Sequence, residues 1–234
     1  MSYLARKLIT KAWHTSGIVA KILQSVSGGQ ASDGLELFNE LLATKTMQQE
    51  LIPYFKEYSL NSVIGQEKYF IPGLIEIETF TFNIDSVRFP TERKGRAQYF
   101  GTGKAENVQS LPFSWHLEKC LGGANLYLTF NPVAVYPLKI WGKFALTAVN
   151  SLDDDLSLIY DLQYLVYLRY ALAEYMCTEY NIPLPQQSAL KLAELEESVI
   201  YISPKDFTVK QVTSFGEAGV DWYRINILGG WTPP

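Results

Sequence analysis

The sequence contains few of the residues that most often carry enzyme chemistry. Its 234 residues include two histidines, His14 and His116, and two cysteines, Cys120 and Cys177. Two distant cysteines define neither a disulfide framework nor a zinc site. Neither histidine lies in a recognisable nucleophile motif. We therefore expect no catalytic residue, no metal and no cofactor, and we interpret the histidines as structural and the cysteines as small buried residues in a reducing compartment.

Long uncharged apolar runs are also missing. The N-terminus has no continuous apolar stretch of signal-peptide type, and its spacing favours a helix of a soluble protein. The most apolar segment, 156–180, contains Asp161, Arg169 and Glu174. Each of these charges would cost about 2.5 to 3.5 kcal/mol in the middle of a bilayer. We therefore expect no membrane span.

An excess of positive charge is absent as well, because the net charge is −4. This argues against a protein held on nucleic acid by bulk electrostatics. The basic residues nevertheless gather in two local groups, which we interpret as solvated faces or subunit contacts rather than nucleic-acid sites. The first group has no acid before Asp33, and the second falls mainly in a polar segment, 91–104, that predicts an exposed loop. They comprise Arg6, Lys7, Lys11 and Lys21, and Arg88, Arg93, Lys94, Arg96 and Lys104.

Two short motifs resemble functional sites without matching them. The stretch 101–104 is similar to the end of a phosphate-binding loop, but Gln98 stands where the first glycine belongs and Ala105 replaces the required Ser or Thr. The acidic run 153–155 lacks the spacing and the turn glycine of a calcium loop, and it favours the start of a helix.

Apolar periodicity divides the chain into a helical start, a β-rich middle, a helical return and a tail. Helical spacing covers 4–16, continues through 18–26 up to Gly28 and Gly29, and resumes after a possible N-cap at Ser32. Period-two patterns then predict a hairpin from Tyr58 to Ile71 with a turn at 65–67, a bent strand over 74–83, and strands over 125–130 and 138–147. A long helix is predicted from 156 to about 180 and another over 186–198, followed by a short strand over 199–203.

These patterns predict an α+β fold, in which a helical bundle carries a β-rich insertion and an extended C-terminal arm. The predicted divisions are the N-terminal helices (1–56), the β-rich insertion (57–150), the C-terminal helices (151–203) and the arm (204–234).

Aromatic residues, by contrast, are abundant. Fifteen Tyr, twelve Phe and five Trp make up 14% of the chain, and such residues concentrate where protein meets protein. The arm is too apolar for simple disorder, so we expect it to pack on a neighbour or on its own subunit. Its candidate anchors are Trp222, Tyr223, Ile225, Leu228 and Trp231.

The order of elements resembles a known family, the head-to-tail adaptor proteins of short-tailed bacteriophages, also called tail accessory factors or tail tubular adaptors. The segment 34–42 is similar to that family's Leu-x-x-Leu-Asn-x-x-Leu helix, and 65–73 looks like its Gly-Gln-x-x-Tyr turn. Further similarity lies in the strand 84–90 and in the returning helix around 170–175, which ends before Pro183.

The resemblance implies a structural virion protein at the head-to-tail junction, assembled in the host bacterial cytoplasm. Such proteins form a ring, usually a dodecamer, that binds the portal protein and a tail nozzle or hub protein. The ring lumen continues the channel through which DNA passes without sequence-specific binding. On this interpretation the arm residues bind the portal or a neighbour, and Arg93, Lys94, Arg96 and Lys104 form a loop that touches DNA, a tail protein or only water.

Two other classes of function stay open. A carbohydrate-binding β module would use Trp115 or Trp141 as its aromatic platform. A virion-associated cell-wall hydrolase would need two carboxylates held about 5 to 9.5 Å apart, and the sequence does not single out such a pair.

Overall fold

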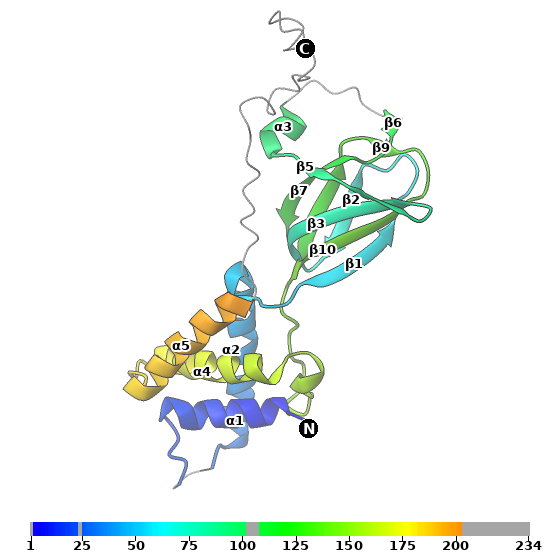
Figure 1. Ribbon diagram of the computed structural model, residues 1–234. Helices are drawn as coiled ribbons and strands as arrows, with labels where there is room; N and C mark the ends of the chain where they lie inside the picture. Colours follow the sequence, from blue (N-terminus) through cyan, green and yellow to red (C-terminus); the bar gives the residue numbers. More distant parts are fainter. Residues whose placement is uncertain (1, 23–24, 102–107, 203–234) are drawn as a thin grey trace, which may run out of the picture. The chain divides into compact units, whose positions relative to one another are not determined.

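The computed structural model describes residues 2–22, 25–101 and 108–202, and it has a mixed α+β fold (Figure 1). The α+β class predicted from the sequence is therefore confirmed. The described helices are α1 (Ala5–Ser16), α2 (Gly28–Met47), α3 (Arg96–Phe100), α4 (Leu162–Glu179) and α5 (Gln186–Ile202), with short 3-10 turns η1 (Gln49–Leu51) and η2 (Leu156–Leu158). The strands are β1 (Lys56–Asn61), β2 (Lys68–Pro72), β3 (Leu74–Ile84), β4 (Val87–Pro90), β5 (Glu92–Arg93), β6 (Gln109–Ser110), β7 (Ser114–Cys120), β8 (Gly123–Leu128), β9 (Asn131–Pro132) and β10 (Pro137–Phe144).

Helices from both ends of the sequence share one hydrophobic core. Helix α1 lies beside α4, and α2 and α5 also pack on α4 (Figure 1). The buried members of this core all come from residues 3–51 and 149–199. Polar contacts tie the same helices together, since Lys45 Nζ in α2 lies 3.1 Å from a carboxylate oxygen of Glu196 in α5.

The ends of α1 and α2 follow from local chemistry. Helix α1 stops at Gly17, whose φ of +79° is a left-handed conformation that glycine adopts without strain. Helix α2 begins directly after Ser27, whose hydroxyl accepts from the Gln30 N–H while the Gln30 side chain accepts from the Ser27 N–H. The expectation of a second helix over 18–26, ended by Gly28 and Gly29, was therefore wrong. This capping box outweighs the poor helix propensity of the two glycines.

The strands form two four-stranded sheets that share a second core. The sheet orders are β1-β10-β3-β4 and β2-β8-β7-β5, and β6 pairs with β9 in a separate two-stranded piece. Inward side chains of both sheets, including Phe82 of β3 and Leu126 of β8, are fully buried in this core. Alternation explains the arrangement, because longer strands such as β2, β8 and β10 bury every second side chain.

The hairpin predicted from Tyr58 to Ile71 is wrong. Strand β1 pairs antiparallel with β10, whereas β2 pairs antiparallel with β8 in the other sheet. The predicted bend in β3 is correct: Trp141 is opposite Thr79, but the next residue, Gly142, is opposite Ile77. Glu78 is therefore an extra residue in the ladder, and this bulge lets Ile77 and Phe80 both face the core.

The acidic run 153–155 was predicted to start the long helix, but it precedes the short turn η2 instead. Asp155 caps η2, and its carboxylate also accepts the backbone N–H of Tyr3 at 2.8 Å. Helix α4 itself starts only at Leu162. At the other end, the strand predicted over 199–203 is wrong, because α5 continues as a helix through Ile202.

Two further expectations need correction or fall outside the described residues. Cys177 is buried as expected, but Cys120 is exposed. The C-terminal arm (204–234) lies outside the described residues. Within the ranges that are described, no helix has the length and apolar character needed to cross a bilayer.

Candidate functional site

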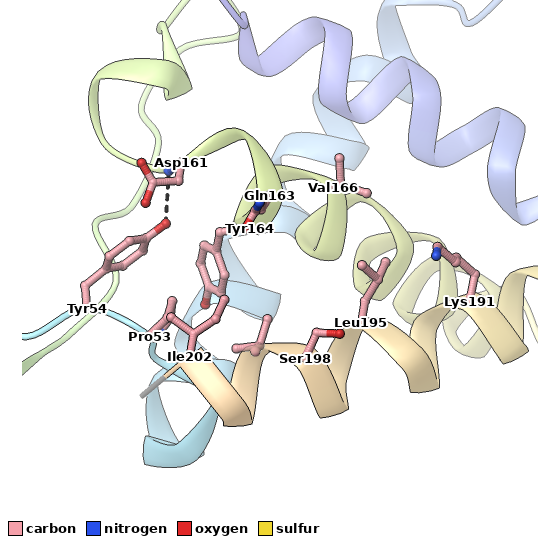
Figure 2. Close-up of a pocket in the computed structure, with 11 residues that line it drawn as sticks. Pro53, Tyr54, Asp161, Gln163, Tyr164, Val166, Lys191, Leu195, Ser198 and Ile202 are labelled. Carbon is pink, nitrogen blue, oxygen red and sulfur yellow. Dashed lines mark hydrogen bonds between the residues drawn. The ribbon is translucent and has the colours of Figure 1, made fainter. Parts of the chain in front are cut away.

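A largely apolar pocket of about 550 Å³ lies on the helical part of the chain (Figure 2). Its walls come from three places: the segment after η1, the start of α4, and one face of α5. The lining residues are Pro53, Tyr54, Asp161, Gln163, Tyr164, Val166, Lys191, Leu195, Ser198, Val199 and Ile202. We call this feature the α4–α5 groove.

Two tyrosines make the rigid end of the α4–α5 groove. The Tyr54 hydroxyl accepts a hydrogen bond from the Asp161 backbone N–H at 2.9 Å, as Figure 2 shows. Its ring meets that of Tyr164 edge to face with centroids 5.4 Å apart. The Tyr164 hydroxyl in turn donates to the carbonyl of Leu51 at 3.1 Å. These contacts lock both rings, so this end of the groove has a fixed shape.

The electrostatics of the α4–α5 groove favour binding over proton transfer. Burial raises the pKa of Tyr54 to about 12, and burial also raises the pKa of Tyr164. Both phenols therefore stay neutral at physiological pH. The Lys191 ammonium at the rim is engaged with Glu194 at 2.8 Å. A fixed apolar hollow with neutral phenols suits the docking of apolar side chains from another protein.

Helix α5 supplies the apolar wall through residues at helical spacing. Leu195, Val199 and Ile202 follow one another on one face, and Ile202 is 56% exposed. This wall was not predicted from the sequence, because the helix was expected to end at Ser198. The spacing from Leu192 onward carried the signal, since an apolar residue recurs every three or four positions up to Ile202.

A second exposed apolar surface lies where two loops of the β-rich part meet. Val63 and Ile64 follow β1, Val133 and Val135 precede β10, and all four are about half exposed or more, between 48% and 58%. Ser62 joins the loops, because its N–H donates to the Tyr136 carbonyl at 2.8 Å and its hydroxyl accepts from the Tyr136 N–H at 2.8 Å. We call this surface the β-loop tip. It presents β-branched side chains on a backbone that is already ordered.

The basic segment predicted as a loop is partly a strand and a helix. Arg93 lies in β5 with its guanidinium 5.8 Å from the Trp115 ring centroid, and Arg96 at the start of α3 pairs with Glu118 at 3.3 Å. The Lys94 backbone N–H donates to the Trp115 carbonyl at 2.7 Å. The structure therefore brings these three residues to one edge of the sheet. Lys104 lies outside the described residues.

Aromatic packing holds α3 against this sheet. Tyr99 of α3 is buried, stacks on His116 with ring centroids 5.5 Å apart, and hydrogen-bonds to the Leu128 carbonyl at 2.9 Å. The Tyr99 hydroxyl also contacts the carboxylate of Glu67. His116 Nδ1 hydrogen-bonds to the Lys94 carbonyl at 3.0 Å. His116 thus fixes the β5–α3 connection in place.

The remaining predicted site residues have different outcomes. Trp222, Tyr223, Ile225, Leu228 and Trp231 lie outside the described residues. The two tryptophans proposed as carbohydrate platforms differ sharply: Trp115 is 3% exposed and packs in the β core, whereas Trp141 is 44% exposed. Among the described residues, no group of three or more His, Cys, Asp or Glu side chains is placed to hold a metal ion.

No protein-family model matches this sequence, and no curated protein matches it at a significant level. The family and the function are therefore proposed from the chain's own residues and contacts.

Proposed function

We propose that this chain is a ring-forming structural subunit of the head-to-tail adaptor type. In this proposal a helical bundle, built from 1–56 and 151–203, carries a β-rich insertion, 57–150, and an arm, 204–234. The ring would join a portal protein to a tail nozzle or hub protein in a virion and continue the channel used for genome retention and ejection. Its assembly would take place in the host bacterial cytoplasm.

One observation carries most of the proposal. The helical core draws its buried side chains from residues 3–51 and 149–199, and the β core draws its own from residues 69–140. A segment with its own core between two halves of another core is what an insertion requires. The same order of elements is implied by the resemblance to the adaptor family.

The exposed apolar surfaces support an assembly role. The α4–α5 groove and the β-loop tip both expose aliphatic side chains to solvent. A ring subunit must contact two neighbours through different faces, since its interfaces are head-to-tail rather than self-complementary. Two separate apolar surfaces on different elements meet that requirement.

Mass photometry of the purified chain, alone and mixed with its candidate portal, tests the proposal. We expect a species of ring mass in at least one condition. Ile202→Glu in the α4–α5 groove and Val135→Glu in the β-loop tip should each reduce it, because each places a charge in an apolar contact. Leu121→Glu is the matched control, since Leu121 is fully exposed on the β7–β8 turn outside both surfaces. A monomer under every condition overturns the proposal.

A carbohydrate-binding role is the second candidate, favoured by one surface feature. A shallow hollow of about 250 Å³ on the sheet β1-β10-β3-β4 places the exposed Trp141 ring beside Thr79, Thr81, Arg88 and Lys139. An aromatic face with nearby polar groups is able to hold a sugar ring. Calorimetric titration of the monomer with cell-surface glycans tests this role. Heat that is absent in Trp141→Ala would support it, and no heat with the native chain would contradict it.

A further inference from the structure

Four basic side chains gather where α1 meets α4. Lys7 and Lys11 lie one turn apart on α1, and their ammonium groups stand 5.3 and 5.4 Å from the centroid of the same Tyr3 ring. Tyr3 is buried, so the ring is a fixed platform for both charges. Lys21, in the segment after α1, is close enough for its charge to act on Lys11. We call Lys7, Lys11, Lys21 and Arg169 the α1–α4 cationic cluster.

Arg169 joins this cluster from a distant part of the sequence. It lies on α4, its charge acts on both Tyr3 and Lys11, and its guanidinium carbon is 4.5 Å from the Tyr170 ring centroid. Its Nε atom is buried and makes no hydrogen bond within the described residues. A desolvated donor of this kind raises the free energy of the chain, and because this atom is out of reach of solvent, Arg169 contributes to the cluster through its positive charge.

The charges of the cluster are not neutralised by neighbouring acids. In the part of the chain that the structure describes, no carboxylate forms an ion pair with any of the four side chains. The nearby acids are already engaged, because Asp153 pairs with Arg6 and Asp155 accepts from Tyr3 and Ser157. Burial lowers the pKa of Lys11, and the charges of Lys7, Arg169 and Lys21 lower that pKa further. The cluster therefore concentrates positive charge that the described part of the chain leaves uncompensated.

We propose that the α1–α4 cationic cluster binds backbone phosphates of double-stranded DNA. The contact has no sequence preference, because it uses the charge of the four side chains rather than hydrogen bonds to base edges. The identity of DNA as the source of the phosphates rests on the proposed function, in which DNA passes the chain. The site itself rests on the geometry of Lys7 and Lys11 around Tyr3, supported by the charges of Arg169 and Lys21 that act on Lys11.

Charge density favours DNA over an acidic protein surface. Duplex DNA carries one negative charge per about 1.7 Å of its axis. One face of an acidic helix offers about one carboxylate per 5.4 Å turn. Two lysines over one ring, together with the charges of Arg169 and Lys21 that act on Lys11, match the denser array.

Fluorescence anisotropy with a labelled DNA duplex and the full chain, over a range of salt concentrations, tests the site. Four phosphate contacts predict a slope of log affinity against log salt of about −3.6, which is about a 150-fold loss of affinity between 50 and 200 mM salt. Lys7→Gln with Lys11→Gln should reduce the slope to about −1.8, or about a 12-fold loss. Lys7→Arg with Lys11→Arg should retain the native slope.

Lys56→Gln with Lys68→Gln is the matched control, because it removes the same charge from two exposed lysines that also lie over aromatic rings, but on the strands β1 and β2. The proposal is overturned if the native chain binds DNA without salt dependence, or if the cluster variant and this control behave alike. It is also overturned if inorganic phosphate or polyglutamate displaces the labelled duplex as well as unlabelled duplex does. Those last results would indicate a small-anion site or an acidic protein partner.

Mass photometry of the Lys7→Gln, Lys11→Gln chain separates this inference from the proposed function. We expect the variant to form the same large species as the native chain. Ring formation by the native chain without any DNA binding by that native chain would overturn the phosphate site alone. DNA binding by a chain that never forms a ring would instead contradict the adaptor proposal.

Discussion

The side chain of Asn39 gives the sharpest stability prediction. In α2 its amide nitrogen donates to the Val149 carbonyl at 2.9 Å, and its amide oxygen accepts from the Val149 N–H at 2.8 Å. It thereby pairs both backbone groups of a residue that is only 2% exposed. Asn39→Ala leaves both of those groups without a partner. Each unsatisfied buried group costs about 1 to 3 kcal/mol, and because Asn39 is half-buried we expect about 2 to 4 kcal/mol in all.

Urea unfolding followed by the helical circular dichroism signal measures this loss. With a slope of about 2 kcal/mol per molar urea, the midpoint should fall by about 1 to 2 M. Asn83→Ala is the comparison, because the buried amide oxygen of Asn83 has no hydrogen-bond partner among the described residues. We expect that change to stay within about 1 kcal/mol. A loss below about 1 kcal/mol for Asn39→Ala, or equal losses at the two positions, would refute the reasoning.

Three further changes probe other contacts. Gly34→Ala should destabilise the helical core by about 1 to 3 kcal/mol in the same urea assay, because its new Cβ would collide with Ile9, and an unchanged midpoint would contradict this. Tyr164→Phe should cost about 1 to 2 kcal/mol by removing the donor to the Leu51 carbonyl, and thermal melting measures it. The hydrogen bond from the Ser157 side chain, followed by that from the Tyr3 backbone, lowers the pKa of Asp155. The ionised carboxylate therefore stabilises the fold at pH values above the ordinary pKa of Asp. This stabilisation is lost as the pH falls through the lowered pKa. Asp155→Asn should therefore flatten the decline of melting temperature below about pH 4, and an unchanged decline would exclude the contribution.

Apolar periodicity predicted the elements correctly where no specific side-chain contact or long-range strand pairing overrode it. Helix α1, its end at Gly17, the bend of β3 and the strands β8 and β10 all follow from residues close together in sequence. The start of α2 was missed because a capping box at Ser27 depends on one specific pair of side chains rather than on an average over a window.

Strand pairing was harder, because partners are chosen by burial across the whole chain. The segments around β1 and β2 were predicted to form a hairpin, because both have strand patterns and Gly65 lies between them; both are indeed strands, and Gly65 has a positive φ. Each instead found a longer partner in a different sheet. Local spacing gives no information on that choice.

The candidate surfaces were likewise predictable only where they depend on residues close together in sequence. The basic residues of the N-terminal segment are evident from the sequence, but only the packing of α1 on α4 brings Arg169 beside them. The α4–α5 groove was missed because Tyr54 and Ile202 are far apart in the sequence and meet only in the folded chain.

The division of the two cores has a consequence for synthesis on the ribosome. All buried side chains of the β core have been translated once residue 140 is made, whereas the helical core still awaits residues 149–199. The strands are therefore able to fold while α1 and α2 still lack most of their packing partners. In that interval the apolar faces of α1 and α2, including Trp13 and Phe38, are open to solvent, and a chaperone that shields apolar helices would act there.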